Sequence, residues 1–278
     1  MERLQAAIIK AREKQKGSQG SATRAPGQAE SDLVTPPLWS EIPQAELQDR
    51  ILRRNRIVSM RSDPEATPFD MLRTRTLRTM QEHGWRRLAI TSPTPACGKS
   101  TISLNLAFSI ARQTNTRAIS MEIDMRNPSQ NRLLGLNRKD GKKGSVGDVL
   151  SGRARFGDLA FLGGDDLAFL TNSAPVHNAS DILLGDGIGQ ILADIEADYQ
   201  PNTMIFDMPP VLVNDDTMAF MQHVDCVLIV AAAGRSTIEE IDRCERELAS
   251  QTNVLGVVLN KCEFAEGGYG GYGYGYGY

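Results

Sequence analysis

Residues 86–101 read RRLAITSPTPACGKST, and the order of residue types in this stretch decides the fold. The first six residues predict a buried β-strand, and SLNLAFSIARQ (103–113) carries apolar residues at helical spacing. SPTPACGKST (92–101) is therefore expected to join a strand directly to a helix. A loop in this position binds di- and triphosphates, because its backbone N–H groups converge on the anion and the helix N-terminus adds partial positive charge.

The loop matches the phosphate-loop pattern G-x-x-x-x-G-K-[ST] incompletely, because Pro93 stands at the first glycine position. Lys99 is expected to reach the β- and γ-phosphates of a nucleotide, and Ser100 to place its hydroxyl on Mg²⁺. A helix N-terminus without a ligand is the alternative, but the position between a strand and a helix favours nucleotide binding. The residues expected to contact the nucleotide are Thr94, Pro95, Ala96, Cys97, Gly98, Lys99, Ser100 and Thr101.

Strands and helices alternate along the rest of the chain. Strand patterns lie at 118–124, 203–208, 225–233 and 254–260, and helical patterns at 44–54, 65–82, 191–199 and 236–250. Short apolar strands separated by helices predict an α/β fold of the P-loop type, with a parallel-rich central sheet and helices on both faces. Residues 137–190 are rich in glycine with weak periodicity, so element boundaries there are poorly defined.

Three regions are expected. Residues 1–43 predict a short charged helix and a linker rich in Gly, Ser and Pro, residues 44–264 the nucleotide-binding domain, and residues 265–278 a mobile tail. Within the 278 residues, the longest apolar run (226–233) is far shorter than the roughly 20 residues of a bilayer-spanning helix, and residues 1–15 lack the apolar block of a signal peptide. A cytoplasmic location is therefore expected. The cysteines and histidines keep no zinc-ligand spacing, which argues against a structural metal.

Carboxylates follow two of the expected strands. TMIFDMPP leaves Asp207 at the end of a strand that Pro209 and Pro210 terminate, so Asp207 is expected to organise a metal ion. In AISMEIDMRNP, Glu122 and Asp124 are two residues apart, and on a strand their side chains point to the same face. Two buried carboxylates are costly unless they serve a cation or accept a proton, and Asp124 is preferred because it is nearer the strand's end.

The charge is distributed unevenly along the chain. Residues 50–87 contain ten arginines and no lysine, against only four acidic residues (Asp63, Glu65, Asp70 and Glu82). A solvated helix face and a protein–protein contact both explain this pattern. Nucleic acid is not expected as a partner, because no aromatic residues interleave the arginines.

Taken together, SPTPACGKST, EIDMRNPS and MIFDMPPVL resemble the Walker A, A′ and B motifs of the bacterial tyrosine kinases that regulate capsule and exopolysaccharide synthesis, a branch of the deviant P-loop ATPases. The resemblance runs from about Phe69 to Lys261 and includes FDMLRTRTLRTM, which is similar to the arginine-rich helix that these kinases use for ring assembly, and VLGVVLNK. There are three departures: the family usually has aspartate at the position of Glu122 and glycine near Ala96, and its assembly helix normally opens with glutamate, where this chain has Asp70 or Leu72 depending on the register.

The resemblance implies a set of residue roles. ATP and Mg²⁺ are the implied cofactors, with Ser100, Asp124 and Asp207 at the metal. The implied catalytic residues are Lys99, Asp124, Glu122 and Asp207, and the implied assembly residues are Asp70, Arg73, Arg75 and Arg78. The implied partners are a membrane chain-length regulator that activates the kinase at the inner face of the membrane, further copies in a ring, and a tyrosine phosphatase.

The chain ends in EGGYGGYGYGYGY, in which glycine separates the tyrosines and disfavours both helix formation and burial. The expected phosphoacceptors are Tyr269, Tyr272, Tyr274, Tyr276 and Tyr278. Each phosphotyrosine adds roughly 1.5 to 2 negative charges, so full modification is hypothesised to disperse a ring by self-repulsion. The alternative is a low-complexity solubilising segment.

Two other functions remain open from the sequence. A partitioning or positioning ATPase of the same superfamily would carry a signature lysine early in the phosphate loop, whereas this chain has no lysine between Arg87 and Lys99. A non-catalytic nucleotide-binding adaptor of a polysaccharide export complex is compatible with the departures at Glu122 and Ala96.

Overall fold

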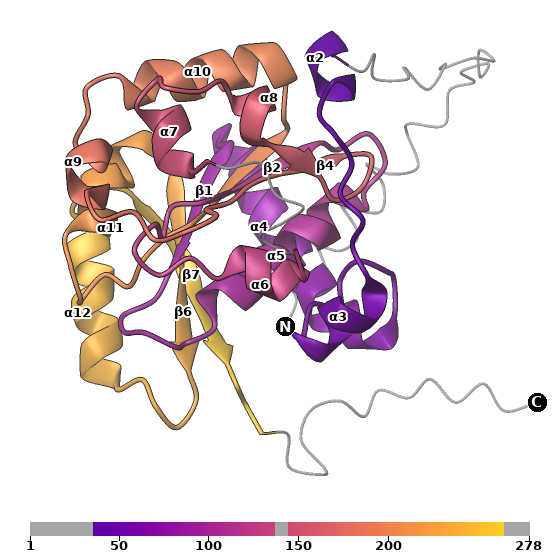
Figure 1. Cartoon of the computed structure of the whole chain (residues 1–278). Coiled ribbons are helices and arrows are strands. Elements are labelled where there is room, and N and C mark those ends of the chain that lie inside the picture. Colours follow the sequence, from indigo (N-terminus) through magenta and orange to yellow (C-terminus); the bar gives the residue numbers. More distant parts are fainter. Residues whose placement is uncertain (1–35, 137–143, 264–278) are drawn as a thin grey trace, which may run out of the picture. The chain divides into compact units, whose positions relative to one another are not determined.

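The computed structural model of the chain describes residues 36–136 and 144–263. Within these residues, one sheet contains β1 (Arg87–Thr91), β2 (Ala118–Glu122), β3 (Phe161–Leu162), β4 (Leu167–Leu170), β5 (Thr203–Asp207), β6 (Cys226–Ala232) and β7 (Asn253–Asn260). The strand order is β3-β4-β2-β5-β1-β6-β7. Figure 1 labels β1, β2, β4, β6 and β7 of this sheet. All neighbouring strands are parallel except β3 and β4, which are antiparallel. The predicted α/β class with a parallel-rich sheet is confirmed.

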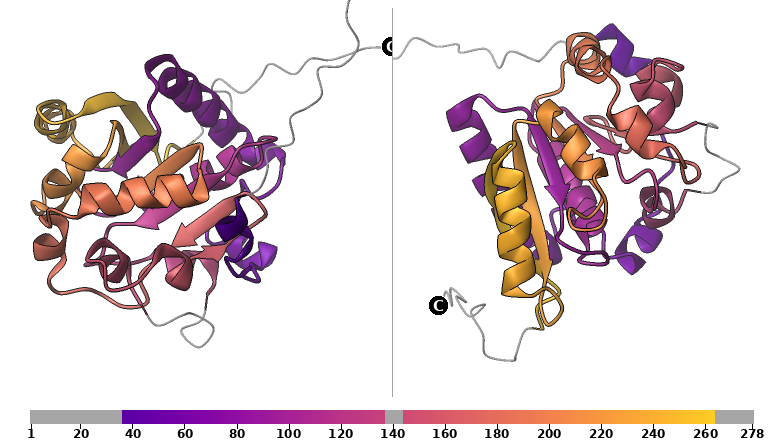
Figure 2. Two further views of the ribbon diagram at one scale, coloured as in Figure 1. Left: turned by 90° about the horizontal axis from the view of Figure 1, so that it is seen from above. Right: turned by 90° about the vertical axis from the view of Figure 1, so that its left-hand side faces the viewer.

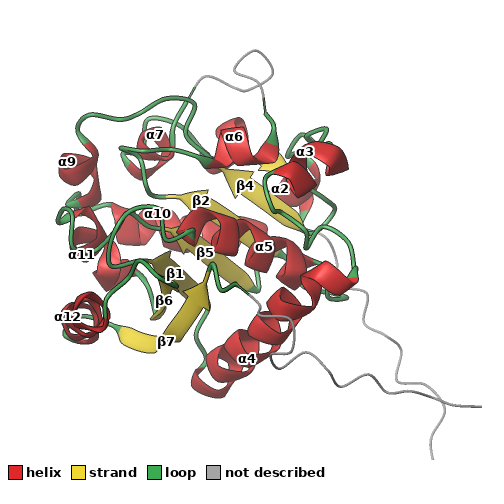
Figure 3. Cartoon of the chain, turned by 90° about the horizontal axis from the view of Figure 1, so that it is seen from below, coloured by secondary structure: helices red, strands yellow, loops and turns green. Residues whose placement is uncertain are grey.

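Helices cover both faces of this sheet (Figure 2). They are α2 (Pro37–Ser40), α3 (Asp49–Arg54), α4 (Thr67–His83), α5 (Lys99–Ala111), α6 (Gln130–Leu134), α7 (Val146–Leu150), α8 (Phe156–Leu159), α9 (Ala179–Leu183), α10 (Ile188–Tyr199), α11 (Asp216–Phe220) and α12 (Ile238–Ala249), with 3₁₀ helices η1 (Pro64–Ala66) and η2 (Met221–His223). One core lies under α4 and α5, which Figure 3 shows crossing the sheet, and the other lies under α10, α11 and α12.

The strands are apolar along their whole length because helices cover both faces of the sheet. In β1, Ala89 packs in the core on one face, whereas Leu88 and Ile90 pack in the core on the other face. All three side chains are fully buried, so neither face of the strand can carry polar residues. For the same reason α5, which lies in the centre of one layer, is buried along most of its length.

The folded domain begins earlier than the sequence predicts. Trp39 and Ile42 belong to the expected linker but are only 2% and 3% exposed. The Trp39 indole Nε1 donates a hydrogen bond to the carbonyl oxygen of Asp165 at 2.8 Å. The linker boundary at residue 43 is therefore wrong, because the side chains of this segment complete the core beside β3.

Two element boundaries also differ from the prediction. The helix expected over 44–54 begins only at Asp49, because Gln44 forms a parallel bridge with Leu162 of β3. The strand expected over 118–124 ends at Glu122, because the N–H groups of Ile123 and Asp124 both turn to the carbonyl oxygen of Asp207, at 2.9 and 3.0 Å.

The remaining expectations concern the ends of elements and of the chain. The helix that was expected to stop at Gly84 does so, with Gly84 in the left-handed conformation at a φ of 71°. No helix within the described ranges is both long and apolar enough to cross a lipid bilayer. Residues 1–35 and all five tyrosines of the C-terminal cluster lie outside the described residues.

Candidate active site

The predicted site residues come together where three neighbouring strands end. β5 lies between β1 and β2 in the sheet, and the register pairs Asp207 with both Ile90 of β1 and Glu122 of β2. Since the strands are parallel, their carboxyl ends share one edge, and the loop after β1 leads from that edge into α5. Ligands of open α/β sheets bind at this edge.

The phosphate loop has the backbone shape that an anion site requires. Ala96 and Gly98 have left-handed φ values of 62° and 96°, and α5 begins at Lys99 directly after them. A backbone in which left-handed residues alternate with residues of negative φ points successive N–H groups into one concavity. The start of the loop is fixed by neighbouring backbone, because the N–H groups of Val211 and Leu212 donate to the carbonyl oxygens of Ser92 and Pro93 at 2.9 and 3.1 Å.

Lys99 and Asp124 form a buried ion pair at the mouth of this loop. Their Nζ and Oδ2 atoms are 2.5 Å apart, and the two residues are 9% and 4% exposed. Burial lowers the pKa of Lys99, but the nearby carboxylates of Asp207, Asp124 and Glu122 together outweigh it, so that the pKa is raised. The lysine therefore stays charged, as binding of an anion requires.

Asp207 is completely buried beside this pair. Burial raises its pKa, although the charge of Lys99 and the side chains of Ser100 and Gln130 act in the opposite direction. By distance and angle, the only side-chain hydrogen bond to this carboxylate among the described residues comes from Gln130 Nε2, which donates to Oδ2 at 3.1 Å; the Ser100 hydroxyl is nearby but forms no such bond, and Oδ1 has no partner there. A buried carboxylate oxygen without a donor, next to a serine hydroxyl and Asp124, matches the oxygen ligands that Mg²⁺ prefers. The residues present therefore fit this ion.

Glu122 is held by N–H groups instead. Its Oε1 accepts hydrogen bonds from the backbone of Ser129 and Gln130 at 2.5 and 2.7 Å, and its Oε2 accepts one from the backbone of Asn172 at 3.0 Å. Burial raises the pKa of Glu122 to about 7, against these hydrogen bonds, which lower it. The side chain thus organises the loop that carries Gln130 to Asp207.

The strand on which Glu122 and Asp124 were predicted to share one face ends between them. β2 ends at Glu122, and the chain then bends over the end of β5, so the two side chains have different partners. Only Asp124 contacts Lys99. The desolvation of Glu122 is offset by backbone donors, which do not require a cation.

Three polar residues of the site were missed from the sequence. Gln130 and Asn172 hold Asp207 and Glu122, and the guanidinium of Arg126 binds Asp216 through Nε at 2.5 Å. Asn172 follows β4, which lies in the region without clear periodicity. Had LAFL been identified as a strand, a polar residue next to its carboxyl end would have been the signal.

The four predicted assembly residues on α4 have different environments. The Asp70 carboxylate accepts hydrogen bonds from Ser109 Oγ at 2.5 Å and from the guanidinium of Arg112, and Arg73 Nη1 donates to the Ser109 carbonyl at 2.9 Å. Both side chains thus tie α4 to α5. Arg75 and Arg78 are exposed, and within residues 36–136 and 144–263 the one ion pair of Arg78 is with Glu82, one turn along the helix, at 2.9 Å.

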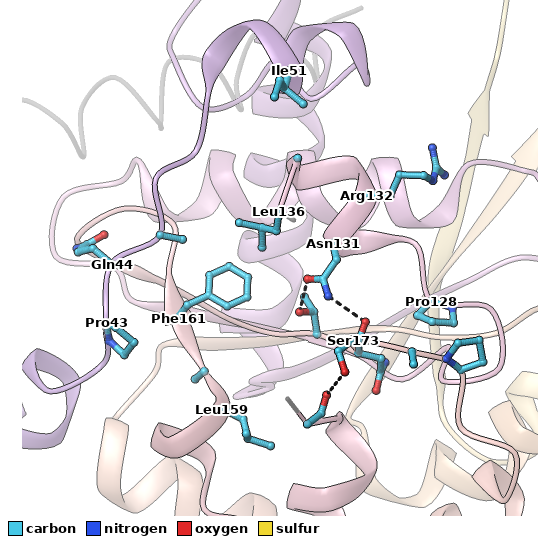
Figure 4. Close-up of a pocket in the computed structure, with 18 of the residues that line it drawn as sticks. Pro43, Gln44, Ile51, Pro128, Asn131, Arg132, Leu136, Leu159, Phe161 and Ser173 are labelled. Carbon is cyan, nitrogen blue, oxygen red and sulfur yellow. Dashed lines mark hydrogen bonds between the residues drawn. The ribbon is translucent and has the colours of Figure 1, made fainter. Parts of the chain in front are cut away.

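A cavity of about 730 Å³ is lined by residues of α6, of β3 and of the segment that follows β4. Phe161, Leu136 and Asn131 line it, and the Asn131 amide donates to the carbonyl oxygen of Asn172 at 3.0 Å (Figure 4). None of the residues predicted to contact nucleotide lines this cavity. The cavity therefore lies next to Glu122, which Asn172 contacts. It is separate from the predicted phosphate loop, residues 92–101.

Comparison with known proteins agrees with this geometry. The ParA family model, described as the NUBPL iron-transfer P-loop NTPase, matches residues 86–270. The putative tyrosine-protein kinase EpsB of Ralstonia nicotianae is 31% identical over 200 residues, which are 71% of this chain and 26% of that protein. The tyrosine-protein kinase CpsD of Streptococcus pneumoniae serotype 4 is 27% identical over 66% of this chain and 79% of that protein.

Among solved structures, the kinase domain of the Escherichia coli tyrosine kinase ETK aligns with a TM-score of 0.65 at 25% identity, covering 78% of this chain and 82% of that one. The chain spans about a quarter of the length of EpsB. It therefore belongs to the ParA family of P-loop NTPases, among relatives that are named bacterial tyrosine-protein kinases.

Proposed function

We propose that this chain is an ATP-dependent protein-tyrosine kinase that phosphorylates its own C-terminal tyrosines and regulates exopolysaccharide or capsule polymerisation and export. The observation that carries the proposal is the buried Lys99–Asp124 pair at the mouth of a phosphate loop, beside an Asp207 oxygen that has no hydrogen-bond partner among the described residues. The names of the relatives support the same activity. The proposed acceptors are Tyr269, Tyr272, Tyr274, Tyr276 and Tyr278.

The proposed mechanism assigns one task to each group. The loop N–H groups and the Lys99 ammonium bind the phosphates of ATP, for which Lys99 must leave Asp124. Ser100, Asp124 and Asp207 would hold Mg²⁺, which neutralises charge on the triphosphate when bound. Catalysis of phosphoryl transfer consists mainly of such positioning and electrostatic stabilisation, so rigid burial of these side chains is the relevant property.

The acceptor phenol must lose a proton during transfer. A free tyrosine has a pKa near 10, so at neutral pH it reacts poorly unless a base accepts that proton. As the phenol oxygen bonds to the γ-phosphorus and the bond to ADP breaks, the proton passes to a site carboxylate. Asp124 is the better candidate than Glu122, because Asp124 Oδ2 loses its donor when Lys99 moves to the phosphates, whereas Glu122 keeps backbone N–H donors on both oxygens.

The path of the chain supports delivery of the tyrosines to this edge. β7 is parallel to β6 and ends at Asn260, whose side chain contacts the phosphate loop. Tyr269 follows Lys261 by eight positions, so the two residues can be separated by at most about 29 Å. Both the chain's own site and that of a neighbouring copy in a ring are compatible with this reach, and the ring is proposed.

The remaining parts of the proposal rest on the resemblance of the sequence motifs to those of bacterial tyrosine kinases. A membrane chain-length regulator would activate the kinase, so that it acts at the inner face of the membrane, and a tyrosine phosphatase would reverse the modification. The exposed Arg75 and Arg78 are the proposed contacts to the next copy of the ring.

The test is an autophosphorylation assay on the purified chain with labelled ATP and Mg²⁺, with and without a cytoplasmic fragment of a candidate regulator. Phosphotyrosine is expected in the wild type and not in Lys99→Met or in a chain that ends at residue 263. Label that persists in Lys99→Met would refute the site. Nucleotide binding without phosphotyrosine under both conditions would instead favour the adaptor, and DNA- or membrane-stimulated hydrolysis the partitioning ATPase.

A further inference from the structure

Two consecutive residues at the end of β7 contact the phosphate loop directly. Asn260, at the end of β7, donates from Nδ2 to the carbonyl oxygen of Cys97 at 2.8 Å. Lys261, the next residue, donates from Nζ to the carbonyl oxygen of Ala96 at 2.7 Å. Two consecutive side chains from another strand thus bind two consecutive carbonyls of the loop.

These carbonyls matter because of the shape of the loop. A backbone whose N–H groups converge on an anion must point its carbonyls away from the anion, where they need other donors. Ala96 reaches this shape with a φ of 62°, which is unfavourable for any residue other than glycine. The hydrogen bonds from Asn260 and Lys261 stabilise this conformation from the outer side.

The fit around Gly98 shows how closely the two elements approach. A Cβ atom at Gly98 would lie 2.2 Å from Nδ2 of Asn260. Asn260 therefore fills the space that a side chain at position 98 would take. The glycine of the motif permits both the left-handed φ of 96° and this contact.

The choice of lysine at position 261 is unusual for this domain. In the described residues, Lys99 and Lys261 are the only lysines, and every other permanently cationic side chain is arginine. Both lysines act on the same loop, one inside its concavity and one on its outer side. Lys261 also has a left-handed φ of 60°, so its own backbone is held in an uncommon conformation at this contact.

We propose that Asn260 and Lys261 are positioning residues, which clamp the phosphate loop in its anion-binding conformation without touching the nucleotide. This inference rests on the proposed nucleotide site and adds a device that holds its shape. It also means that the segment carrying the tyrosines begins at residues that are part of the loop's support.

The test compares two ligands, Mg·ATP and Mg-tripolyphosphate, by calorimetric titration. Asn260→Ala and Lys261→Met should each weaken both ligands by the same factor, about 2- to 10-fold, because each removes one hydrogen bond that shapes the phosphate site. Lys261→Arg should restore most of the affinity. Cys262→Ser, which changes the next exposed residue, is the matched control and should bind as the wild type does.

A second variant tests the mechanism. Ala96→Gly removes the intrinsic penalty of the left-handed φ, so in the Lys261→Met background it should recover part of the lost affinity. Loss of affinity for Mg·ATP alone, with tripolyphosphate unaffected, would mean that the two residues contact the base and would overturn the proposal. Unchanged affinity for both ligands would overturn it as well.

Amide hydrogen exchange on the protein without ligand tests the clamp independently of the proposed nucleotide site. Peptides covering 92–101 should exchange faster in Lys261→Met than in wild type, and equal rates would refute the clamp. If the wild type binds neither ligand, the proposed nucleotide site fails, while the exchange rates still decide whether the clamp exists.

Discussion

At the scale of single residues, the Lys99–Asp124 contact governs how a nucleotide can enter. The pair is buried, so its mutual attraction is weakly screened, and a phosphate must displace the carboxylate before Lys99 can bind it. A metal ion that binds Asp124 would release the lysine. The pair therefore disfavours binding of a nucleotide that arrives without a divalent cation.

Asp124→Asn should raise the affinity for metal-free ADP about 10-fold or more, because it frees Lys99 and removes a negative charge from the phosphate site. The same variant should lose phosphotyrosine formation. Titration calorimetry in the presence of a chelator measures the first effect. Asp194→Asn on α10 serves as the control, because it removes an exposed carboxylate that accepts a hydrogen bond from Gln190. Unchanged or weaker ADP binding by Asp124→Asn would contradict this role.

His223 predicts a pH dependence of stability. Burial lowers its pKa from the usual 6.5, and the charge of Arg87 lowers it further. Below pH 6.5 the unfolded chain therefore binds a proton that the folded chain rejects, and stability falls as the pH falls towards the folded pKa. Between pH 8 and pH 5, the free energy of unfolding measured in urea should fall less for His223→Gln than for wild type. Parallel curves would show that this histidine titrates alike in both states.

At the scale of elements, the segment before α3 acts as part of the core. Trp39 is 2% exposed, its ring is 6.0 Å from the guanidinium carbon of the buried Arg117, and its indole binds the Asp165 carbonyl. Residues 43–45 then pair with β3. This segment therefore protects a sheet edge that would otherwise present unpaired backbone groups.

Trp39→Ala should lower the free energy of unfolding by about 3–5 kcal/mol, because it leaves a large cavity in the core and an unpaired carbonyl. The measurement is urea denaturation monitored by circular dichroism. Trp85→Ala is the comparison, since Trp85 is only partly buried and stacks on the exposed His83. If residues 36–43 were a linker, as the composition predicts, Trp39→Ala would have the smaller effect of the two.

At the scale of the whole molecule, assembly concerns the exposed part of α4. Asp70 and Arg73 hold α4 on α5, so their replacement would change the fold of the monomer as well as any interface. Arg75 and Arg78 have no such internal task in the described residues. They are therefore the residues at which assembly can be tested without unfolding the chain.

The double variant Arg75→Glu, Arg78→Glu should shift the chain towards monomer in light scattering, with an unchanged melting temperature, because the only internal contact it removes is an exposed helix pair with Glu82. Arg243→Glu on α12 reverses a charge in a similar exposed pair and should leave the oligomeric state unchanged. The interface assignment is wrong if both variants have the same size distribution as the wild type.

The amino-acid sequence by itself determined the class of fold and the position of the phosphate site. A strand followed by GKST and a helix, repeated apolar strands, and Asp207 before two prolines are local patterns, and local patterns are set by neighbours along the chain. For that reason Lys99, Asp124 and Asp207 could be expected at one sheet edge. Gly84 was recognised as a helix end on the same ground.

Only the tertiary structure decided the partners of those residues. Glu122 and Asp124 look equivalent on a strand, but the N–H groups at 123 and 124 bond to Asp207, and this long-range contact ends the strand. The two carboxylates then have different partners, Lys99 for Asp124 and backbone N–H groups for Glu122. Trp39 lies in a sequence typical of a linker, and its burial depends on β3 and Asp165, more than 100 residues away. The hydrogen bonds from Asn260 and Lys261 likewise join segments that the fold alone brings together, because burial and hydrogen bonding depend on neighbours in space.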